Sequence, residues 1–160
     1  MIRITNLTLC CSAALAVLLS SNAGADARPP KTSADKVKLT VDATKPDAEG
    51  VQTVTLTLNI EKGWHLYANP VGQMDLVDAQ TVVKLSGKGK PEVVKIEYPT
   101  GVEVKDKVVG DYRVYEDKVE IKATVKRAKG DTGPLEATVK FQACNDKTCL
   151  QGATVKVPVE

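Results

Sequence analysis

The chain has 160 residues, with 22 lysines and arginines against 20 acids, one histidine and four cysteines. A formal charge of +2, with no basic block or stripe, argues against nucleic acid as a partner. Four cysteines in a chain of this length are too few for a miniprotein held together by disulfides.

The first 25 residues have the pattern of a secretory signal peptide. Arg3 supplies a positive charge, residues 9–19 form a short apolar run, and residues 23–25 or 25–27 offer small side chains before a cleavage point. The run is too short and wrongly flanked for a membrane span. Cys10 could instead mark a lipoprotein, although a bulky leucine precedes it. We therefore expect an exported mature chain without a membrane span, in a compartment where disulfides persist.

Residues 26–36 are expected to form a flexible leader, and residues 37–160 a single domain long enough to bury a core. From Val37 onward, apolar and polar residues alternate, which predicts strands with one buried face. Turns rich in glycine and proline separate these strands, and no stretch of useful length has helical periodicity. About seven or eight such strands predict an all-β fold, an antiparallel immunoglobulin-like β-sandwich. The predicted strands lie at residues 37–41, 54–60, 81–85, 92–97, 119–126, 135–143 and 153–159.

Cys144 and Cys149 are the most informative feature of the mature chain. They are the two cysteines expected to remain after export, and they lie a few residues apart at the end of a predicted strand. A disulfide between them would close a very small loop and would stabilise the fold by roughly 2 kcal/mol, less than a bridge between distant strands. This placement favours redox exchange, in which a thiolate attacks a disulfide sulfur, over a purely structural role.

Two sequences stand out along the domain, GWHLYANP at residues 63–70 and FQACNDKTC at residues 141–149. Between them come a Pro/Gly turn at residues 98–101, a charged loop at residues 105–110 and the sequence YED at residues 115–117. In order and spacing, these segments together resemble the amino-terminal periplasmic domain of DsbD, a family of thiol–disulfide interchange proteins. The resemblance covers nearly the whole mature chain and is most specific in the cysteine segment.

This resemblance implies a sandwich whose cysteine pair lies at one end, beneath a movable cap loop. It implies a periplasmic domain that accepts electrons from the thioredoxin-like domain of a membrane thiol reductase. The domain would then pass these electrons to oxidised periplasmic thiol proteins. No cofactor and no metal are expected.

The resemblance also implies roles for the two cysteines. Cys149 would attack the partner and form the mixed disulfide, which Cys144 would resolve. Lys147 and Lys140 would bias one sulfur toward the thiolate, whereas Asp146 would oppose them, which leaves the sign of the net shift open.

Residues 104–110 correspond to the cap loop of the family. Val108 stands where relatives place an aromatic residue, Val109 follows it in the same loop, and Asp106 would assist proton transfer. An ordinary charged hairpin loop is the alternative for this segment.

His65 and Tyr67 would line the wall of the site and adjust the protonation of the thiols. In the alternative interpretation, Trp64, Leu66 and Ala68 pack inward on a short strand and leave His65 at the surface.

Two departures from the family leave the reduction potential and the direction of electron flow open: a short spacer at residues 145–148 and the absence of a proline just after the second cysteine. One competing hypothesis is an exported binding or adaptor module with a local structural disulfide. Another is a Cu(I) site formed by Cys144, Cys149 and either His65 or Met74. Hydrolase chemistry finds little support, because the lone histidine has no recognisable serine context.

Overall fold

The computed structural model describes residues 31–159. The predicted signal peptide, the first part of the predicted leader, and Cys10 and Cys11 lie outside the described residues.

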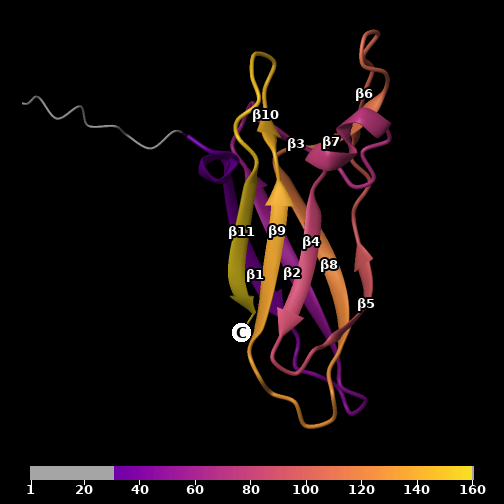
Figure 1. Cartoon of the computed structure of the whole chain (residues 1–160), viewed down its shortest axis with the longest axis vertical. Coiled ribbons are helices and arrows are strands. Elements are labelled where there is room, and N and C mark those ends of the chain that lie inside the picture. The colour runs from indigo at the N-terminus through magenta and orange to yellow at the C-terminus, as the bar shows by residue number, and fades with distance from the viewer. Residues whose placement is uncertain (1–30, 160) are drawn as a thin grey trace, which may run out of the picture.

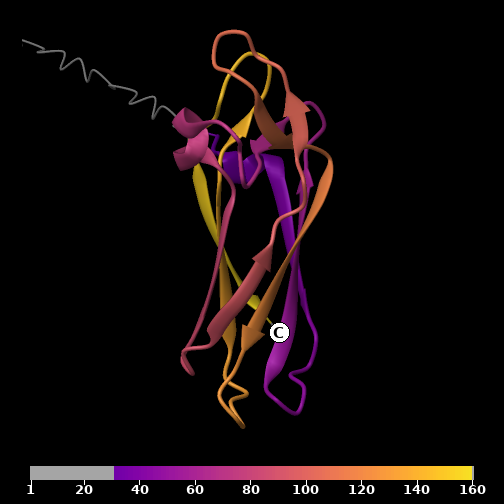
Figure 2. The same ribbon diagram turned by 90° about the vertical axis from the view of Figure 1, so that its right-hand side faces the viewer.

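Two antiparallel sheets face each other and form a sandwich (Figure 1). Figure 2, turned by 90°, shows the two layers with the core between them. One layer has the strand order β1-β2-β8-β5 and the other has the order β11-β9-β4. The fold is therefore the immunoglobulin-like antiparallel sandwich that the alternation predicted. The strands are β1 (Val37–Ala43), β2 (Val51–Ile60), β8 (Lys118–Lys126), β5 (Glu92–Glu97), β11 (Ala153–Val159), β9 (Leu135–Phe141) and β4 (Val82–Gly87).

The core lies between the two layers and is built from the buried face of each strand. Leu56 on β2 pairs with Ile121 on β8, and both side chains are fully buried. Phe141, at the end of β9, belongs to the same continuous hydrophobic cluster. Because successive side chains of a strand point to opposite faces, the alternation in the sequence corresponds to core and solvent.

A third, smaller sheet lies at one end of the sandwich, at the top of Figure 1, and we call this the site end. Its strand order is β10-β3-β7-β6. A short 3-10 helix, η2 (Met74–Ala79), lies beside it. The strands are β10 (Ala143–Cys144), β3 (His65–Tyr67), β7 (Tyr112–Tyr115) and β6 (Val102–Val104).

The last residues of the predicted leader form a short helix that contacts the cysteine segment. Residues Ser33–Lys36 form a 3-10 helix, η1, and Ser33 is fully buried. The Ser33 backbone N–H and hydroxyl both donate to the carbonyl of Gln151, at 2.9 and 2.8 Å, and its hydroxyl accepts from the Ala143 N–H at 2.9 Å. These bonds satisfy backbone groups next to β10, which fixes the start of the domain against the cysteine segment.

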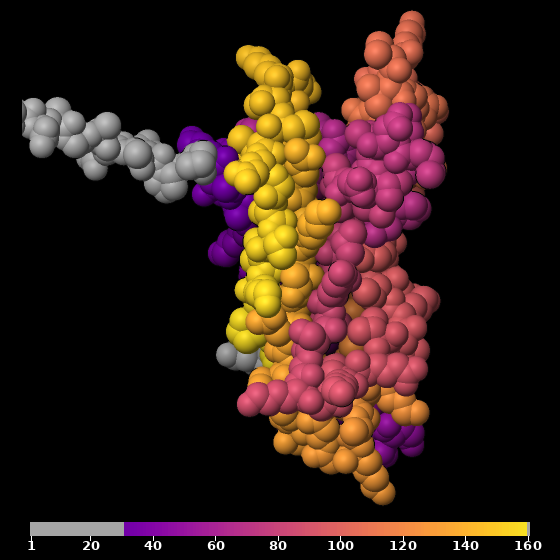
Figure 3. Space-filling model, in the orientation of Figure 1, coloured from indigo at the N-terminus to yellow at the C-terminus, as the bar shows by residue number. Residues whose placement is uncertain are grey.

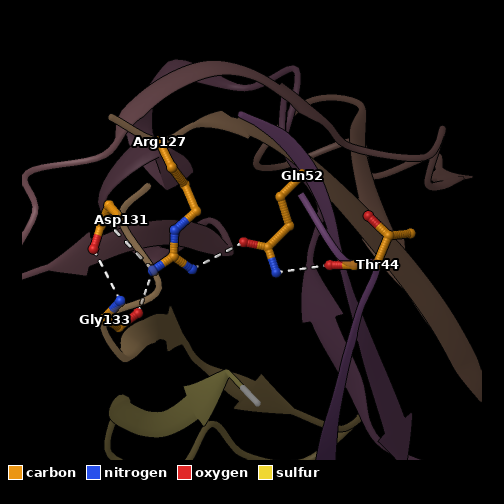
Figure 4. A network of polar contacts seen from close by, with 5 residues as sticks. All are labelled: Thr44, Gln52, Arg127, Asp131 and Gly133. Carbon is orange, nitrogen blue, oxygen red and sulfur yellow. Dashed lines mark hydrogen bonds and ion pairs between the residues drawn. The ribbon is translucent and has the colours of Figure 1, made fainter. Parts of the chain in front are cut away.

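A buried polar network fixes the opposite end of the sandwich, which we call the distal end (Figure 4). Arg127 is 8% exposed, and its guanidinium donates to the Gln52 side chain at 3.2 Å and to the carbonyl of Gly133. The carboxylate of Asp131 lies 3.5 Å from the same guanidinium, and the Gln52 amide donates to the carbonyl of Thr44 at 2.8 Å. The network thereby joins the β1–β2 turn to the β8–β9 loop.

Candidate functional site

A disulfide joins Cys144 and Cys149 at the site end. Cys144 lies in β10, and the chain then turns tightly so that Cys149 faces it across an antiparallel bridge. The Asn145 N–H donates to the carbonyl of Thr148 at 2.9 Å, and the side chain of Asn145 accepts from two further backbone N–H groups of the turn. Local hydrogen bonds therefore hold the two cysteines face to face.

The two cysteines differ in their access to solvent. Cys144 is 2% exposed, because β3 covers β10 on one side and the returning segment covers it on the other. Cys149 lies on the returning segment and is exposed. A thiolate attacks a disulfide at the sulfur that it can reach, and of these two cysteines only Cys149 is exposed.

His65 and Tyr67 lie on the same face of the small sheet as Cys144. His65 is the register partner of Cys144 across β10 and β3, and Tyr67 follows two residues later on the same face of β3. The Tyr67 hydroxyl lies 3.8 Å from the sulfur of Cys144, at hydrogen-bond distance for sulfur. The rings of His65 and Tyr112 lie 6.1 and 5.9 Å from the Tyr67 ring. These three rings form a row that we call the aromatic wall, and His65 and Tyr67 are its members next to Cys144.

The residues on either side of His65 pack the other way. Leu66 and Ala68 are buried in the core, and Trp64 is half-buried against it. The inward packing proposed for these three residues is therefore present, and His65 is at the same time half-buried beside the cysteine pair. One face of the short strand β3 thus packs into the core, and the other face lies beside the cysteine pair.

Burial shifts the ionisation of this wall toward neutral side chains. Burial lowers the pKa of His65 below its ordinary value of 6.5, and the carboxylates of Glu116 and Asp146 oppose this shift. Burial raises the pKa of Tyr67, and the neighbouring Tyr112 raises it further. Near pH 7 the Tyr67 phenol is protonated, so its hydroxyl can donate a hydrogen bond to sulfur.

The predicted cap loop projects beside the cysteine segment and does not lie over it. Figure 1 shows the cysteine turn and the β6–β7 loop as two separate projections, and Figure 3 shows open space between them. Val108 is 94% exposed and Val109 is 40% exposed. The Asp106 carboxylate accepts hydrogen bonds from the N–H groups of these two valines, at 2.7 and 2.9 Å, and these bonds lower its pKa. In this conformation Asp106 stabilises its own loop.

The structure therefore brings His65 and Tyr67 to the cysteines and leaves Asp106, Val108 and Val109 in the second projection. Lys147 and Lys140, the two predicted sources of positive charge, are exposed. Of the two extra ligands proposed for Cu(I), His65 lies at the cysteines and Met74 lies on η2. Within residues 31–159, no group of three or more His, Cys, Asp and Glu side chains could hold a metal ion.

Three residues of the site end were not predicted from the sequence. Tyr112 completes the aromatic wall, Ser33 supports β10, and Gln73 binds the cap loop. No periodic pattern marks Tyr112, because the four residues of β7 do not alternate between buried and exposed positions. The other two are single polar residues in connecting segments, and no sequence pattern marks them.

Neither short helix within residues 31–159 has the length or the apolar character that a membrane crossing requires. A search of the curated proteins finds no match.

Solved structures with a similar fold support the architecture described above. The N-terminal periplasmic domain of ScsB from Proteus mirabilis is 16% identical, with a TM-score of 0.55 over 78% of this chain and 46% of that one. This chain thus spans about half of the ScsB domain.

Two structures from Neisseria meningitidis are also similar. The reduced DsbD N-terminal domain is 18% identical, with a TM-score of 0.46 over 75% of this chain and 83% of that one. A chain in the complex between the DsbD N-terminal and the PilB N-terminal domains is 18% identical, with a TM-score of 0.45 over 83% of this chain and 87% of that one.

A match to a family model decides the membership of the chain. The family described as thiol:disulfide interchange protein DsbD, N-terminal, matches residues 32–160. The matched range is most of the chain. It begins at Thr32, the N-cap of η1. It includes β10 and both facing cysteines. The chain therefore belongs to the family of DsbD N-terminal, thiol:disulfide interchange domains.

Proposed function

We propose that this chain is a periplasmic electron relay that exchanges its Cys144–Cys149 disulfide with partner proteins. The observation that carries the proposal is the asymmetry of the pair, with Cys149 exposed and Cys144 at 2% exposure beside a tyrosine hydroxyl. Family membership and the signal-peptide pattern of residues 1–25 support the chemistry and the compartment.

The proposed reduction proceeds in two exchange steps. A thiolate of a reduced dithiol partner attacks the Cys149 sulfur, the bond between the cysteines breaks, and Cys144 leaves as a thiolate. The second thiolate of the partner then attacks the partner's own sulfur in the mixed disulfide and releases Cys149. The partner loses two electrons and becomes a disulfide. This domain gains the two electrons and, with two protons, holds two thiols.

Passing the electrons on reverses these steps. The Cys149 thiolate attacks the disulfide of an oxidised periplasmic protein, and Cys144 resolves the mixed disulfide. The thioredoxin-like domain of a membrane thiol reductase is the proposed donor, and oxidised periplasmic thiol proteins are the proposed acceptors.

The aromatic wall would assist these steps at the buried sulfur. The Tyr67 hydroxyl, 3.8 Å from the Cys144 sulfur, would donate a hydrogen bond to the departing thiolate and stabilise its charge. His65, the cross-strand partner of Cys144, would adjust the protonation of that thiol. Asp106, Val108 and Val109 would act from the cap loop, Asp106 in proton transfer and the valines as the cover.

The test uses single cysteine variants of the mature domain and a reduced thioredoxin as the probe. Wild-type oxidised protein should be reduced by this thioredoxin, as followed by alkylation and mass spectrometry of both cysteines. In the reduced variants, the exposed thiol of Cys144→Ser should form a mixed disulfide with a thioredoxin that lacks its resolving cysteine and carries its remaining cysteine as a disulfide with thionitrobenzoate, which leaves as the free thiolate. Cys149→Ser, which keeps the buried thiol, should react at least about tenfold more slowly, because rate depends on access.

Dithiothreitol serves as the control, since it must reduce the wild-type disulfide in the folded protein. A wild-type disulfide that reduced thioredoxin leaves intact would overturn the relay and favour the binding module with a local clip. Equal reactivity of the two variants would overturn the assignment of Cys149 as the attacking sulfur. A reduction potential far below about −300 mV would likewise indicate an inert bridge.

A further inference from the structure

Three residues that can carry a proton lie in one row across the small sheet, whose strands β10, β3 and β7 are neighbours (Figure 1). His65 on β3 is the register partner of Cys144 on β10. On the other side of β3, Leu66 pairs with Tyr115 at the end of β7, and the next step of this register brings Glu116 opposite the imidazole. Register partners of an antiparallel pair share one face of the sheet, with Cβ atoms about 4.5–5.5 Å apart. The row therefore runs from a thiol through an imidazole to a carboxylate.

Side-chain contacts support this arrangement. The His65 ring lies 6.1 Å from the Tyr67 ring, edge to face, and the Tyr67 hydroxyl lies 3.8 Å from the Cys144 sulfur. The imidazole thus stands beside the phenol that contacts the sulfur. Burial lowers the pKa of His65, whereas the charge of Glu116 and then that of Asp146 raise it. Glu116 is therefore close enough to act on the imidazole.

The groups around the imidazole come from each element packed against it. Cys144 faces it from β10, and Tyr67, with Tyr112 behind it, lies along the aromatic wall. Glu116, just after β7, and Asp146, in the cysteine turn, supply two carboxylates. Burial favours the neutral imidazole, and the carboxylates stabilise the imidazolium. Such a balance suits a base that is neutral at rest and takes up a proton during a reaction.

We propose that Cys144, His65 and Glu116 form a proton relay across the small sheet, in which His65 takes the thiol proton of Cys144 and Glu116 stabilises the resulting imidazolium. This inference rests on the proposed function, because it concerns the step in which Cys144 resolves the mixed disulfide. Glu116 is a positioning residue here, since it acts on the sulfur only through the imidazole. A base held by a third group beside a nucleophile is a recurring arrangement in covalent catalysis.

During resolution, the neutral imidazole of His65 removes the proton from the Cys144 thiol. The Cys144 thiolate attacks the Cys149 sulfur of the mixed disulfide, a bond forms between the two cysteines, and the bond to the acceptor breaks. The acceptor leaves as a thiolate, which water protonates, and the imidazolium returns its proton to water. Over the two exchanges this domain loses two electrons, and the acceptor disulfide gains them.

The buried cysteine needs this help more than the exposed one. The thiolate is the species that attacks, and burial disfavours a charged sulfur. Cys144 is 2% exposed, whereas water reaches Cys149 directly. A base on the neighbouring strand gives the buried thiol a route for its proton that bulk water does not offer.

One equivalent of dithiobis(nitrobenzoate), added to the reduced mature domain, separates the two exchanges without a protein partner. Cys149 attacks the reagent and releases a first thionitrobenzoate. Cys144 then attacks the Cys149 sulfur and releases a second one. The second release therefore reports the step of the proton relay, and Cys144→Ser should show the first release only.

The pH profile of the second release distinguishes a base from a merely structural side chain. In wild type, its rate should rise as the imidazole loses its proton and then level off. We expect His65→Gln to lose this step and to slow the second release by at least about tenfold at pH 7, because a positioned general base contributes about 10²-fold or more. Glu116→Gln should move the step to lower pH, because loss of the carboxylate lowers the pKa of His65 further. The weaker base should also slow the plateau by about two- to fivefold.

Glu120→Gln is the matched control. It removes the same charge from an exposed residue on β8, whose carboxylate pairs with Lys118 at 2.8 Å. The carboxylates that act on His65 are those of Glu116 and Asp146, so this variant should leave both releases and the step unchanged.

Nuclear magnetic resonance gives a second readout that does not depend on a rate. His65 is the only histidine of the chain, so its ring signals in a tag-free domain need no assignment. In the reduced protein, Glu116→Gln should lower the midpoint of their titration, and Glu120→Gln should not.

The proposal fails if His65→Gln keeps the rate and the pH profile of the second release, or if Glu116→Gln and Glu120→Gln behave alike in both measurements. Failure of the electron relay would appear separately, as a wild-type disulfide that reduced thioredoxin leaves intact. The two releases of thionitrobenzoate would still report the proton transfer in that case.

Discussion

At the scale of single residues, the difference between Cys144 and Cys149 arises from ordinary strand pairing. Cys144 has β3 on one side and the returning segment on the other, whereas Cys149 is on the returning segment itself. One sulfur thus belongs to the body of the domain and the other to its surface. Exchange needs both properties, because one sulfur must be attacked and the other must be held close enough to resolve the mixed disulfide.

The protonation of His65 should be visible in the stability of the domain. Its pKa in the folded state is below the ordinary 6.5, because burial disfavours the charged imidazolium. As the pH falls below about 6.5, the unfolded state binds this proton first, so the free energy of unfolding decreases until the pH passes the folded pKa. Urea unfolding of oxidised wild type and His65→Gln at pH 7.5 and pH 5 should show a smaller loss in the variant.

Glu116 supplies the control for this prediction. Its charge raises the pKa of His65 and so reduces the difference between the folded and unfolded states. Glu116→Gln should therefore steepen the loss of stability between the two pH values. Equal losses in wild type and His65→Gln would show that the imidazole does not contribute in this pH range.

At the scale of elements, the sequence predicted the long strands and missed the short ones for one physical reason. Strands β8, β9 and β11 alternate between core and solvent over seven or more residues, so their pattern is visible. In β7, the adjacent residues Val114 and Tyr115 are both buried, because the strand packs on both faces. A four-residue strand without alternation leaves no periodic signal.

The sequence pattern also placed the start of β2 too late, for a different reason. The strand begins at Val51, three residues before the predicted start at Val54. Gln52 occupies an inward position at 6% exposure, where its amide binds Arg127 and the carbonyl of Thr44. A polar residue in a core position interrupts the apolar pattern, and only the assembled network at the distal end explains it.

The same reasoning separates the parts of the site. The resemblance of residues 63–70 and of the cysteine segment to the family predicted that His65 and Tyr67 lie at the site, and the structure places both beside Cys144. The hydrogen bonds that Gln73 makes with Val109 and Ser33 with Ala143 join segments far apart in the chain that meet only in the folded protein. Such contacts leave no periodic pattern in either segment.

Two glycines test how tightly the turns are built. Gly50 and Gly63 both have φ of +82°, which costs an alanine about 1 kcal/mol or more. An added methyl group at Gly63 would meet nothing within 4 Å, whereas at Gly50 it would lie 2.6 Å from the carbonyl oxygen of Arg127. We expect Gly63→Ala to cost about 1 kcal/mol and Gly50→Ala about 3 kcal/mol, because only the second adds a clash with backbone.

Urea unfolding of the two variants beside wild type measures both costs. The identical φ makes Gly63→Ala a matched control, so the difference between the variants reports the clash alone. Similar costs at the two positions would show that the β1–β2 turn can move away from the start of the β8–β9 loop.

At the scale of the whole molecule, the two ends of the sandwich differ in how they are built. The distal end is cross-linked by the buried Arg127 network (Figure 4). The site end carries two projections (Figure 3). Val108 and Val109 in one of them and Cys149 in the other are exposed. A continuous core lies between the two ends of the sandwich.

A relay must keep its fold in both redox states, and the position of the disulfide allows this. The bridge spans a sequence separation of only 5, so reduction should lower the free energy of unfolding by about 2 kcal/mol on the chain-entropy model. The core around Leu56, Ile121 and Phe141 does not depend on it. Urea unfolding with and without a phosphine reductant, followed by Trp64 fluorescence, should therefore give a lower midpoint with nearly the same m-value. The double variant Cys144→Ser/Cys149→Ser should match the reduced protein. A reduced domain that is unfolded, or a loss above about 5 kcal/mol, would identify the bridge as a structural staple, because native disulfides of small secreted domains contribute up to that amount.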